Sequence, residues 1–284
     1  MTVVCAGLLT VDVVQVIDRL PRPDEKTVGR EQRLDLGGPA TNAARTVAAL
    51  GMPVRLLACF GASPLTDFAR ATLARDAVEW VDPVAAQANP APVSTVLVTQ
   101  ETGDRAVVSG GGPQVPGDWG CGDVLAGAAV LLIDGHGGDL PARAAAEARR
   151  LGMSVLLDGG SYKPGMEAYL RHVDLALLSA DFAAPDAADA CAWARSHGAR
   201  AAAQSAGPRP IRLVSQAGDR QIPVPRVSRV IDTNGAGDVL HGAAAVAMAG
   251  HGVADPAAVL AYAAQIASRS VAYGGAFGWV GAPG

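Results

Sequence analysis

Several residue types that define common protein classes are scarce in this sequence. Aromatic residues make up only 4% of the 284 residues, and lysine occurs only at Lys26 and Lys163. The cysteines are Cys5, Cys59, Cys121 and Cys191. They lie far apart and form no C-x-x-C pair, so neither a disulfide framework nor a zinc site is predicted. We expect them to be buried thiols in a reducing cytoplasm.

Charge and hydropathy give no sign of a nucleic-acid or membrane partner. Charged residues account for 18% of the chain, the net charge is -4, and no block of one sign occurs. The longest apolar runs, such as residues 124–133 and 243–249, are much shorter than the roughly 18 to 20 residues that a membrane span requires. The first residues lack a basic leader and reach Asp12 early, so we expect a buried strand there rather than a signal peptide. The prediction is a cytoplasmic protein.

Half of the residues are apolar, which is enough for one large domain with a core. Short apolar runs alternate with alanine-rich stretches of helical composition. Strands are predicted at residues 3–9, 54–60, 129–133, 154–158 and 175–179, and helices at 42–50, 64–77, 141–151 and 166–172. Strands that are apolar throughout and separated by helices indicate an α/β fold with a parallel sheet covered on both faces.

Two segments, approximately residues 11–36 and 92–112, depart from this rhythm because apolar and polar residues alternate in them. Such alternation is typical of a sheet with one face in water. The second segment contains Thr102-Gly103-Asp104-Arg105, which predicts a hairpin turn. We interpret both segments as one small antiparallel sheet that projects as a lid over a ligand site. Ordinary edge strands of the main sheet are the alternative.

The segment from Asp232 to Asp238, Asp-Thr-Asn-Gly-Ala-Gly-Asp, is the strongest candidate for chemistry. It is expected to follow an apolar strand that ends at Ile231 and to open an alanine-rich helix. Glycines allow consecutive N–H groups to point into one concavity, and the start of a helix adds unpaired donors. This arrangement suits a phosphoryl group, with the Asp238 carboxylate beside it to accept a proton. A helix cap is the alternative role for Asp238.

A second motif, Gly37-Gly38-Pro39-Ala40-Thr41-Asn42, lies near the amino terminus. Two glycines before a helix let a ligand approach bare backbone, and Asn42 in the first turn offers both a donor and an acceptor. Alone, this motif could be a tight turn with a helix cap. The two motifs together, in this order in one chain, are much more specific.

The sequence resembles the ribokinase-like (PfkB) family of carbohydrate kinases. The resemblance covers essentially the whole chain, from the early strand that ends at Asp12 through both motifs. It implies a single domain over residues 1–284 with a three-layer α/β/α fold, a mostly parallel central sheet and a small β-sheet lid. It also implies a sugar beneath the lid and ATP in a groove beside the last helices, with Mg²⁺ and a monovalent cation such as K⁺.

Position by position, the resemblance implies roles for individual residues. Asp238 would be the general base, and the amides of Gly235, Ala236 and Gly237 would form the anion hole. The residues expected to bind the sugar are Asp12, Lys26, Gly37, Gly38, Asn42 and His136. The residues expected to bind the nucleotide are Ser205, Gly207, Thr233, Gly235, Gly237 and Gly275. A structural role is an equal alternative for His136.

Two departures from the family pattern bear on the phosphate side of the site. The usual Asn-x-x-Glu, which organises Mg²⁺, is replaced by Ser179-Ala180-Asp181-Phe182, so that Asp181 or Asp158 is the candidate metal ligand instead. The usual Thr-x-Gly-x-x-Gly turn is matched only by the segment from Ser205 to Pro210, in which the proline removes one backbone donor.

The prediction is therefore an ATP-dependent kinase that phosphorylates a hydroxyl group of a small carbohydrate. Lys26 and the Asp134-Gly135-His136 segment resemble members that act on ketohexose-like sugars, and the sulfofructose kinases are also similar but are expected to carry arginine at the position of His136. A nucleoside kinase of the same fold and a non-catalytic sugar sensor are the alternatives. A homodimer formed through the lid is also expected.

Overall fold

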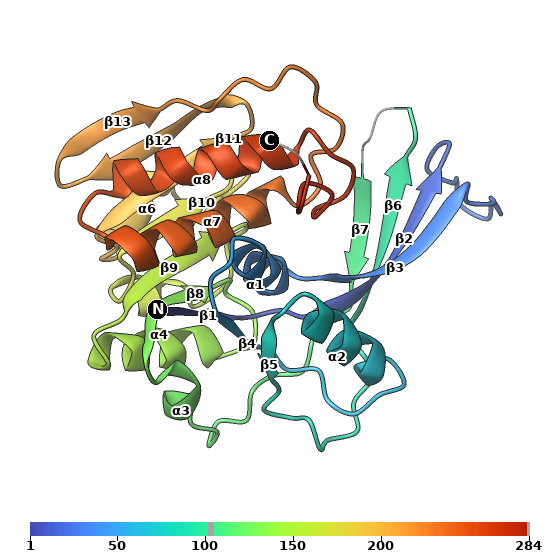
Figure 1. The fold of residues 1–284 in the computed structure, drawn as a ribbon, viewed down its shortest axis with the longest axis horizontal. Helices are drawn as coiled ribbons and strands as arrows, with labels where there is room; N and C mark the ends of the chain where they lie inside the picture. The colour runs from blue at the N-terminus through green and yellow to red at the C-terminus, as the bar shows by residue number, and fades with distance from the viewer. Residues whose placement is uncertain (102–104, 283–284) are drawn as a thin grey trace.

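The computed structural model describes residues 1–101 and 105–282. Its larger sheet has the strand order β13-β12-β11-β10-β9-β8-β1-β4-β5 (Figure 1). These strands are β1 (Thr2–Ala6), β4 (Val54–Leu57), β5 (Glu79–Val81), β8 (Ala128–Ile133), β9 (Ser154–Gly159), β10 (Leu175–Leu178), β11 (Ala201–Ala206), β12 (Arg209–Ser215) and β13 (Gly218–Ile222). Neighbours from β5 to β11 run parallel, and β12 and β13 are antiparallel. The predicted mostly parallel sheet is confirmed.

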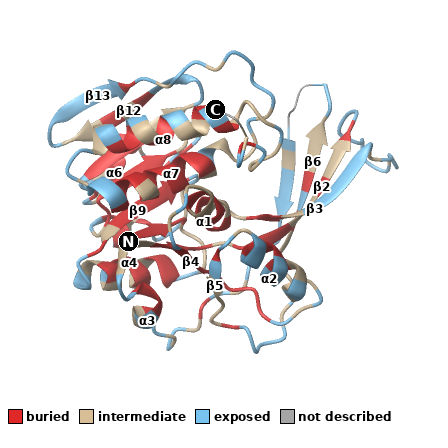
Figure 2. Ribbon diagram, in the orientation of Figure 1, coloured by how far each residue is buried: buried red, intermediate tan, exposed pale blue. Residues whose placement is uncertain are grey.

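Helices cover both faces of this sheet. One face carries α1 (Pro39–Ala49), α2 (Thr66–Arg75), α7 (Ala236–His251) and α8 (Pro256–Ser270). The other carries α3 (Gly122–Leu125), α4 (Leu140–Arg150), α5 (Glu167–Leu170) and α6 (Ala190–Ser196). Val3 and Cys5 of β1 belong to the first core, whereas Val4 and Ala6 belong to the second, because successive side chains of a strand point to opposite faces. Figure 2 shows buried residues concentrated in the strands of the larger sheet and on parts of the helices that pack against it.

Local sequence sets the ends of the helices near the two motifs. Pro39 occupies the first turn of α1, where its missing N–H costs nothing, after Gly38 at a φ of 99°. Gly235 begins α7 in the left-handed region at a φ of 74°, which a residue without a Cβ adopts readily. The Asp255 carboxylate caps α8 by accepting hydrogen bonds from the amides of Ala257 and Ala258.

A smaller sheet projects from the main body (Figure 1). It has the order β3-β2-β6-β7 and consists of β2 (Thr10–Ile17), β3 (Glu31–Gly37), β6 (Val93–Thr99) and β7 (Arg105–Ser109). The predicted lid segments thus form one separate sheet. The expectation of a purely antiparallel sheet was wrong, because the two antiparallel hairpins join through β2 and β6, which run parallel. Residues 102–104 of the predicted turn lie outside the described residues.

The predicted strand that leads into the Asp232–Asp238 motif is absent from the structure. Val230 and Ile231 lie in an irregular segment and are 57% and 55% exposed. The amides of Ile231 and Asp232 donate to the carbonyl oxygen of Val271, at the end of α8, so this segment is bound to a helix end rather than to a sheet. Within residues 1–101 and 105–282, no helix combines the length and the apolar character that a membrane span needs.

Candidate active site

The predicted sugar motif is fixed by a buried carboxylate at the end of β8. Asp134 accepts hydrogen bonds from the amides of Leu8, Ala40 and His136, at 2.9, 3.0 and 2.9 Å. Burial acts to raise the pKa of Asp134, but His136 and these amides outweigh it and hold the pKa below its usual value. The carboxylate therefore joins the start of α1 to the ends of two strands of the main sheet.

The glycines of this motif leave room for its acidic neighbour. A Cβ on Gly37 would lie 2.1 Å from Oδ2 of Asp12, and one on Gly38 would lie 2.2 Å from the carbonyl oxygen of Leu8. Asp12, on β2 of the lid, and Asn42, on α1, each have a buried side-chain oxygen with no hydrogen-bond partner. Buried acceptors of this kind require a donor. Hydroxyl groups of a bound sugar would supply donors to both.

Asp238 links this region to the glycine-rich turn. The Nδ2 atom of Asn42 donates to Oδ2 of Asp238 at 2.7 Å, across 196 residues of sequence. Burial raises the pKa of Asp238 to about 7, and the negative charge of Asp158 adds to the effect. The hydrogen bond from Asn42 acts in the opposite direction. A carboxylate with a pKa near neutrality, beside side-chain oxygens that lack hydrogen-bond donors, is suited to accept a proton from a bound hydroxyl group.

The turn before α7 has the backbone geometry of an anion site. Val239 closes the first helical turn by donating to the carbonyl oxygen of Gly235 at 2.9 Å, so the amides before it lie at the open end of the helix. A Cβ on Gly237 would contact nothing within 4 Å, which leaves open space on that side. Asp232 shapes the turn, because its carboxylate accepts from the amides of Asn234 and Gly275 at 2.8 and 2.9 Å.

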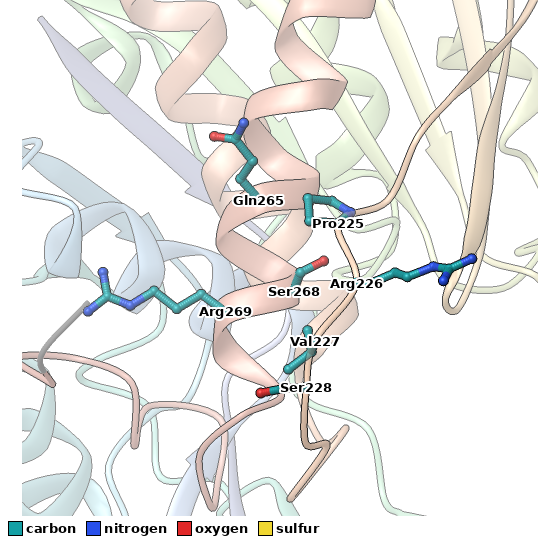
Figure 3. Close-up of a pocket in the computed structure, with 7 residues that line it drawn as sticks. All are labelled: Pro225, Arg226, Val227, Ser228, Gln265, Ser268 and Arg269. Carbon is teal, nitrogen blue, oxygen red and sulfur yellow. The ribbon is translucent and has the colours of Figure 1, made fainter.

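A cavity of 310 Å³ lies between the segment that precedes this turn and α8 (Figure 3). Residues 225–228 form one wall, and Gln265, Ser268 and Arg269 form the other. Residues 231 and 232, whose amides donate to the end of α8, lie in the chain between the cavity wall at residues 225–228 and the turn at Gly235. Residues 225–228 and Gly235 therefore belong to the same connecting segment, between β13 and α7.

The other predicted nucleotide residues occupy the following positions. Ser205 and Gly207 lie at the tight connection of β11 to β12, where Gly207 adopts a φ of 59° and the Ser205 hydroxyl donates to the carbonyl oxygen of Leu178 at 3.3 Å. Thr233 is exposed in the turn before α7. Gly275 is tied to that turn through Asp232.

Within the described residues, three further predicted residues make no hydrogen bond to Asn42 or Asp238. Lys26 is exposed in the connection between β2 and β3, and within the described parts of the chain no hydrogen bond or ion pair joins it to the site. His136 contacts Asp134 and lines a separate cavity of 180 Å³ beside Leu8. Asp158 is buried with a carboxylate oxygen 3.2 Å from Nδ1 of His241.

The described residues do not fit a metal ion held mainly by protein ligands. Nowhere in residues 1–101 and 105–282 do three or more His, Cys, Asp or Glu side chains converge as a metal site would require. Asp181, in the segment that replaces Asn-x-x-Glu, is exposed, and Ser179 donates to the carbonyl oxygen of Gly160.

One residue at the site was not predicted from the sequence. Arg105, at the start of β7 in the lid, donates from Nη1 to Oδ1 of Asn234 in the glycine-rich turn. Its positive charge also acts to lower the pKa of Asp238. In the sequence, Arg105 stands only as the last residue of the predicted Thr-Gly-Asp-Arg turn, and no local signal shows that the start of β7 approaches Asn234.

A family comparison agrees with this geometry. The profile described as pfkB family carbohydrate kinase matches residues 1–278. The chain belongs to this family. The predicted family resemblance is thereby confirmed.

Comparison with individual proteins gives distant matches. Mouse ketohexokinase is 24% identical over 106 residues, a segment that covers 37% of this chain and 36% of that relative. Ribokinase from Thermotoga maritima superposes with a TM-score of 0.80 at 20% identity, covering 99% of this chain and 96% of that one. Ribokinase from Arabidopsis thaliana, solved with ribose and ATP, gives 0.77 at 21% identity, covering 98% and 95%. These structures confirm the ribokinase-like fold.

Proposed function

We propose that this PfkB-family protein transfers the γ-phosphoryl group of ATP to a hydroxyl of a small carbohydrate, with a ketohexose-like sugar favoured. The observation that supports this most strongly is the hydrogen bond of 2.7 Å between Asn42 and Asp238. This bond connects the unpartnered side-chain oxygens of Asp12 and Asn42, which could accept hydrogen bonds from hydroxyl groups, to the anion site beside Asp238. The weak similarity to mouse ketohexokinase supports the choice of sugar.

In this proposal each group has one task. Asp12 and Asn42 accept hydrogen bonds from sugar hydroxyls and hold the reacting one beside Asp238. Asp238 takes the proton of that hydroxyl as its oxygen attacks the γ-phosphorus, and the bond from phosphorus to the β–γ bridging oxygen breaks to release ADP. The amides at residues 235–237 stabilise negative charge on the transferring oxygens. The nucleotide base would occupy the cavity beside α8 that Figure 3 shows.

Arg105 would add a positive charge from the lid. Its guanidinium already contacts Asn234 beside the anion site, so a small movement would place it on a phosphate oxygen. We expect Arg105→Leu to lower kcat about tenfold or more, as for other arginines that act on a transferring phosphoryl group. Arg33→Leu is the matched control, because Arg33 is an exposed arginine of the same sheet on β3. Equal loss in both variants would contradict a specific role for Arg105.

The decisive test measures ADP production with ketoses, aldoses, sugar acids and nucleosides as acceptors. We expect turnover with at least one neutral sugar, and Asp238→Asn should reduce it by a factor of about 100 or more while the protein stays folded. Turnover only with nucleosides would replace the sugar assignment. Sugar binding without any ADP production would indicate a sensor. Activity of the Asn variant within about threefold of the parent would exclude Asp238 as the base.

The lid also supports the proposed homodimer. Val107 and Val108 of β7 and Leu34 of β3 are exposed apolar side chains on the smaller sheet. We expect Val108→Lys to shift the molecular mass in light scattering from dimer to monomer, because a charge would then have to be buried between two lids. A monomeric parent protein would refute this assembly.

A further inference from the structure

One buried cation on α1 has no task in the proposed reaction. Arg45 is only 6% exposed, although arginine side chains lie mostly at protein surfaces. It follows Asn42, which binds Asp238, by three residues, so the two side chains are neighbours on one face of the helix. A buried charge needs partners, and those of Arg45 come from three separate segments of the chain.

The first of these segments is a strand of the lid. Nη1 of Arg45 donates to Oδ1 of Asp35 at 3.2 Å and to the carbonyl oxygen of Leu36 at 3.3 Å, both on β3. Asp35 lies directly opposite Asp12 in the pairing of β2 with β3. Arg45 therefore holds the strand pair that carries the proposed sugar acceptor Asp12.

The second segment fixes Arg45 to the main body. Its Nε donates to Oδ2 of Asp76, at the end of α2, at 2.7 Å. The Asp76 side chain is 21% exposed, whereas that of Asp35 is 42% exposed. Water and salt screen the more exposed pair, so the bond to Asp35 is the weaker of the two. Arg45 can therefore release the lid and remain attached to α2.

The third segment is the stretch of chain that follows α8. The guanidinium carbon of Arg45 lies 4.0 Å from the centre of the Phe277 ring, which makes a cation–π contact. Such a contact is strongest where water is excluded, and this guanidinium is buried. The planar group thus has an aromatic ring against its face and oxygen acceptors around its edge.

Phe277 is joined to the glycine-rich turn through its neighbours. The amide of Gly275 donates to the Asp232 carboxylate at 2.9 Å, and the same carboxylate binds the turn itself. Ala276 packs so closely on the turn that a Cβ on Gly235 would lie 2.7 Å from the Cβ of Ala276. A displacement of Phe277 would therefore shift the turn that forms the proposed anion site.

We propose that Arg45 is a positioning residue that couples the lid to residues 275–280, so that the sugar side and the nucleotide side of the site are held in one arrangement. This inference rests on the proposed function for what binds on each side. The coupling itself is a property of the fold and can be measured without a ligand. Because a coupling free energy is reciprocal, a change on either side must be felt on the other.

The first experiment measures this coupling by hydrogen exchange in the protein without ligand. Asp35→Ala removes a contact in the lid, yet amides in residues 275–280 should exchange about twofold to fivefold faster, as expected for loss of a partly exposed ion pair. Phe277→Leu should in turn speed exchange in β3 (Glu31–Gly37) by a similar factor. If each substitution changes exchange only in its own segment, the proposal is overturned.

Variants at Arg45 test whether the coupling passes through this residue. In Arg45→Met, which keeps an unbranched apolar stem, exchange should rise in both segments. Adding Asp35→Ala to this variant should then cause no further change in residues 275–280, and a further change would refute the route through Arg45. Asp76 keeps its ion pair with Arg75 in this variant, so that carboxylate is not left without a partner.

Arg55→Met is the matched control. Arg55 also donates to backbone carbonyls and pairs with a carboxylate. Within the described part of the chain, its side-chain partners lie outside both segments, at Val124, Ala126 and Glu79. Equal acceleration of both segments by Arg55→Met and Arg45→Met would overturn the proposal. If Arg45→Met does not fold, Arg45→Lys should give the same outcome in its place, because lysine keeps the charge but lacks the planar fork.

The last experiment measures the consequence for binding. In the parent protein, the non-hydrolysable ATP analogue AMP-PNP should lower the dissociation constant of D-fructose, measured by calorimetry, by about fivefold or more. Arg45→Met should reduce this ratio to about twofold or less, whereas a purely structural role would leave it unchanged. A parental ratio near one, or an unchanged ratio in Arg45→Met, would overturn the coupling. If D-fructose does not bind, the ketohexose assignment fails, while hydrogen exchange still decides the role of Arg45.

Discussion

The pH dependence of activity tests the electrostatics of the site most directly. Asp238 must be ionised to accept a proton, and burial together with the charge of Asp158 raises its pKa to about 7. Lowering the pH therefore protonates the base and reduces activity, with the midpoint near pH 7 rather than near the ordinary value for aspartate. A second carboxylate contributes at lower pH, because burial raises the pKa of Asp12 to about 6.

The size of the effect follows from these two values. With a pKa of about 7, roughly nine tenths of Asp238 is ionised at pH 8 and roughly one tenth at pH 6, so kcat/KM should fall about tenfold between them. Below pH 6 the protonation of Asp12 removes a sugar acceptor as well, and the decline should steepen beyond tenfold per pH unit. The midpoint in kcat/KM reports the pKa values of the free protein.

The assay is direct quantification of ADP by chromatography from pH 5 to pH 9, since coupling enzymes would add their own pH dependence. Thermal unfolding at each pH serves as the control for loss of folded protein. A profile that stays flat down to pH 5 would refute the reasoning that burial disfavours the charged form of Asp238. A midpoint near pH 4, the ordinary value for aspartate, would refute it equally.

Four further substitutions test the packing of the chain. A Cβ on Gly242 would lie 2.6 Å from a backbone oxygen of α1, so Gly242→Ala should lower the free energy of unfolding by about 1 to 3 kcal/mol. A Cβ on Gly250, on the same helix, would meet nothing within 4 Å, so Gly250→Ala should raise the free energy of unfolding by about 0.5 to 1 kcal/mol. Urea denaturation measures both changes. Gly37→Ala should displace Asp12 and raise KM for the sugar while KM for ATP stays constant in steady-state kinetics. Arg45 is buried between two carboxylates and the ring of Phe277. Arg45→Ala should therefore lower the free energy of unfolding, measured by urea denaturation, by about 2 kcal/mol or more. A neutral Arg45→Ala, an unchanged sugar KM in Gly37→Ala, or Gly242→Ala as stable as Gly250→Ala would each contradict the packing described.

The sequence predicted the central strands and the first turns of α1 and α7 because local signals control them. Uninterrupted apolar runs indicate strands that are buried on both faces, and Pro39 after two glycines marks a helix start. The edge hairpin of β12 and β13 was missed because its strands are more polar and only partly buried, so they lack that signal. The strand expected at Val230 and Ile231 was wrong for the converse reason: apolar residues there are exposed in a connecting segment.

The side-chain contacts of the site depend on long-range packing and were less accessible. Both glycine motifs were found, but the bond from Asn42 to Asp238 arises from α1 packing against α7, which no spacing in the sequence encodes. Likewise, only the fold brings Asp158 beside His241. A histidine in an otherwise apolar helix face was the one available signal.

The proposed reacting groups are divided between two bodies. Asp12 and Arg105 belong to the smaller sheet, whereas Asp238 and the amides before it belong to the larger one. Neither sheet alone carries all of the proposed groups, so the proposed site is complete only while the smaller sheet stays against the larger one. A small molecule that bound between the two sheets and separated them would therefore inhibit the proposed reaction without resembling a sugar or a nucleotide.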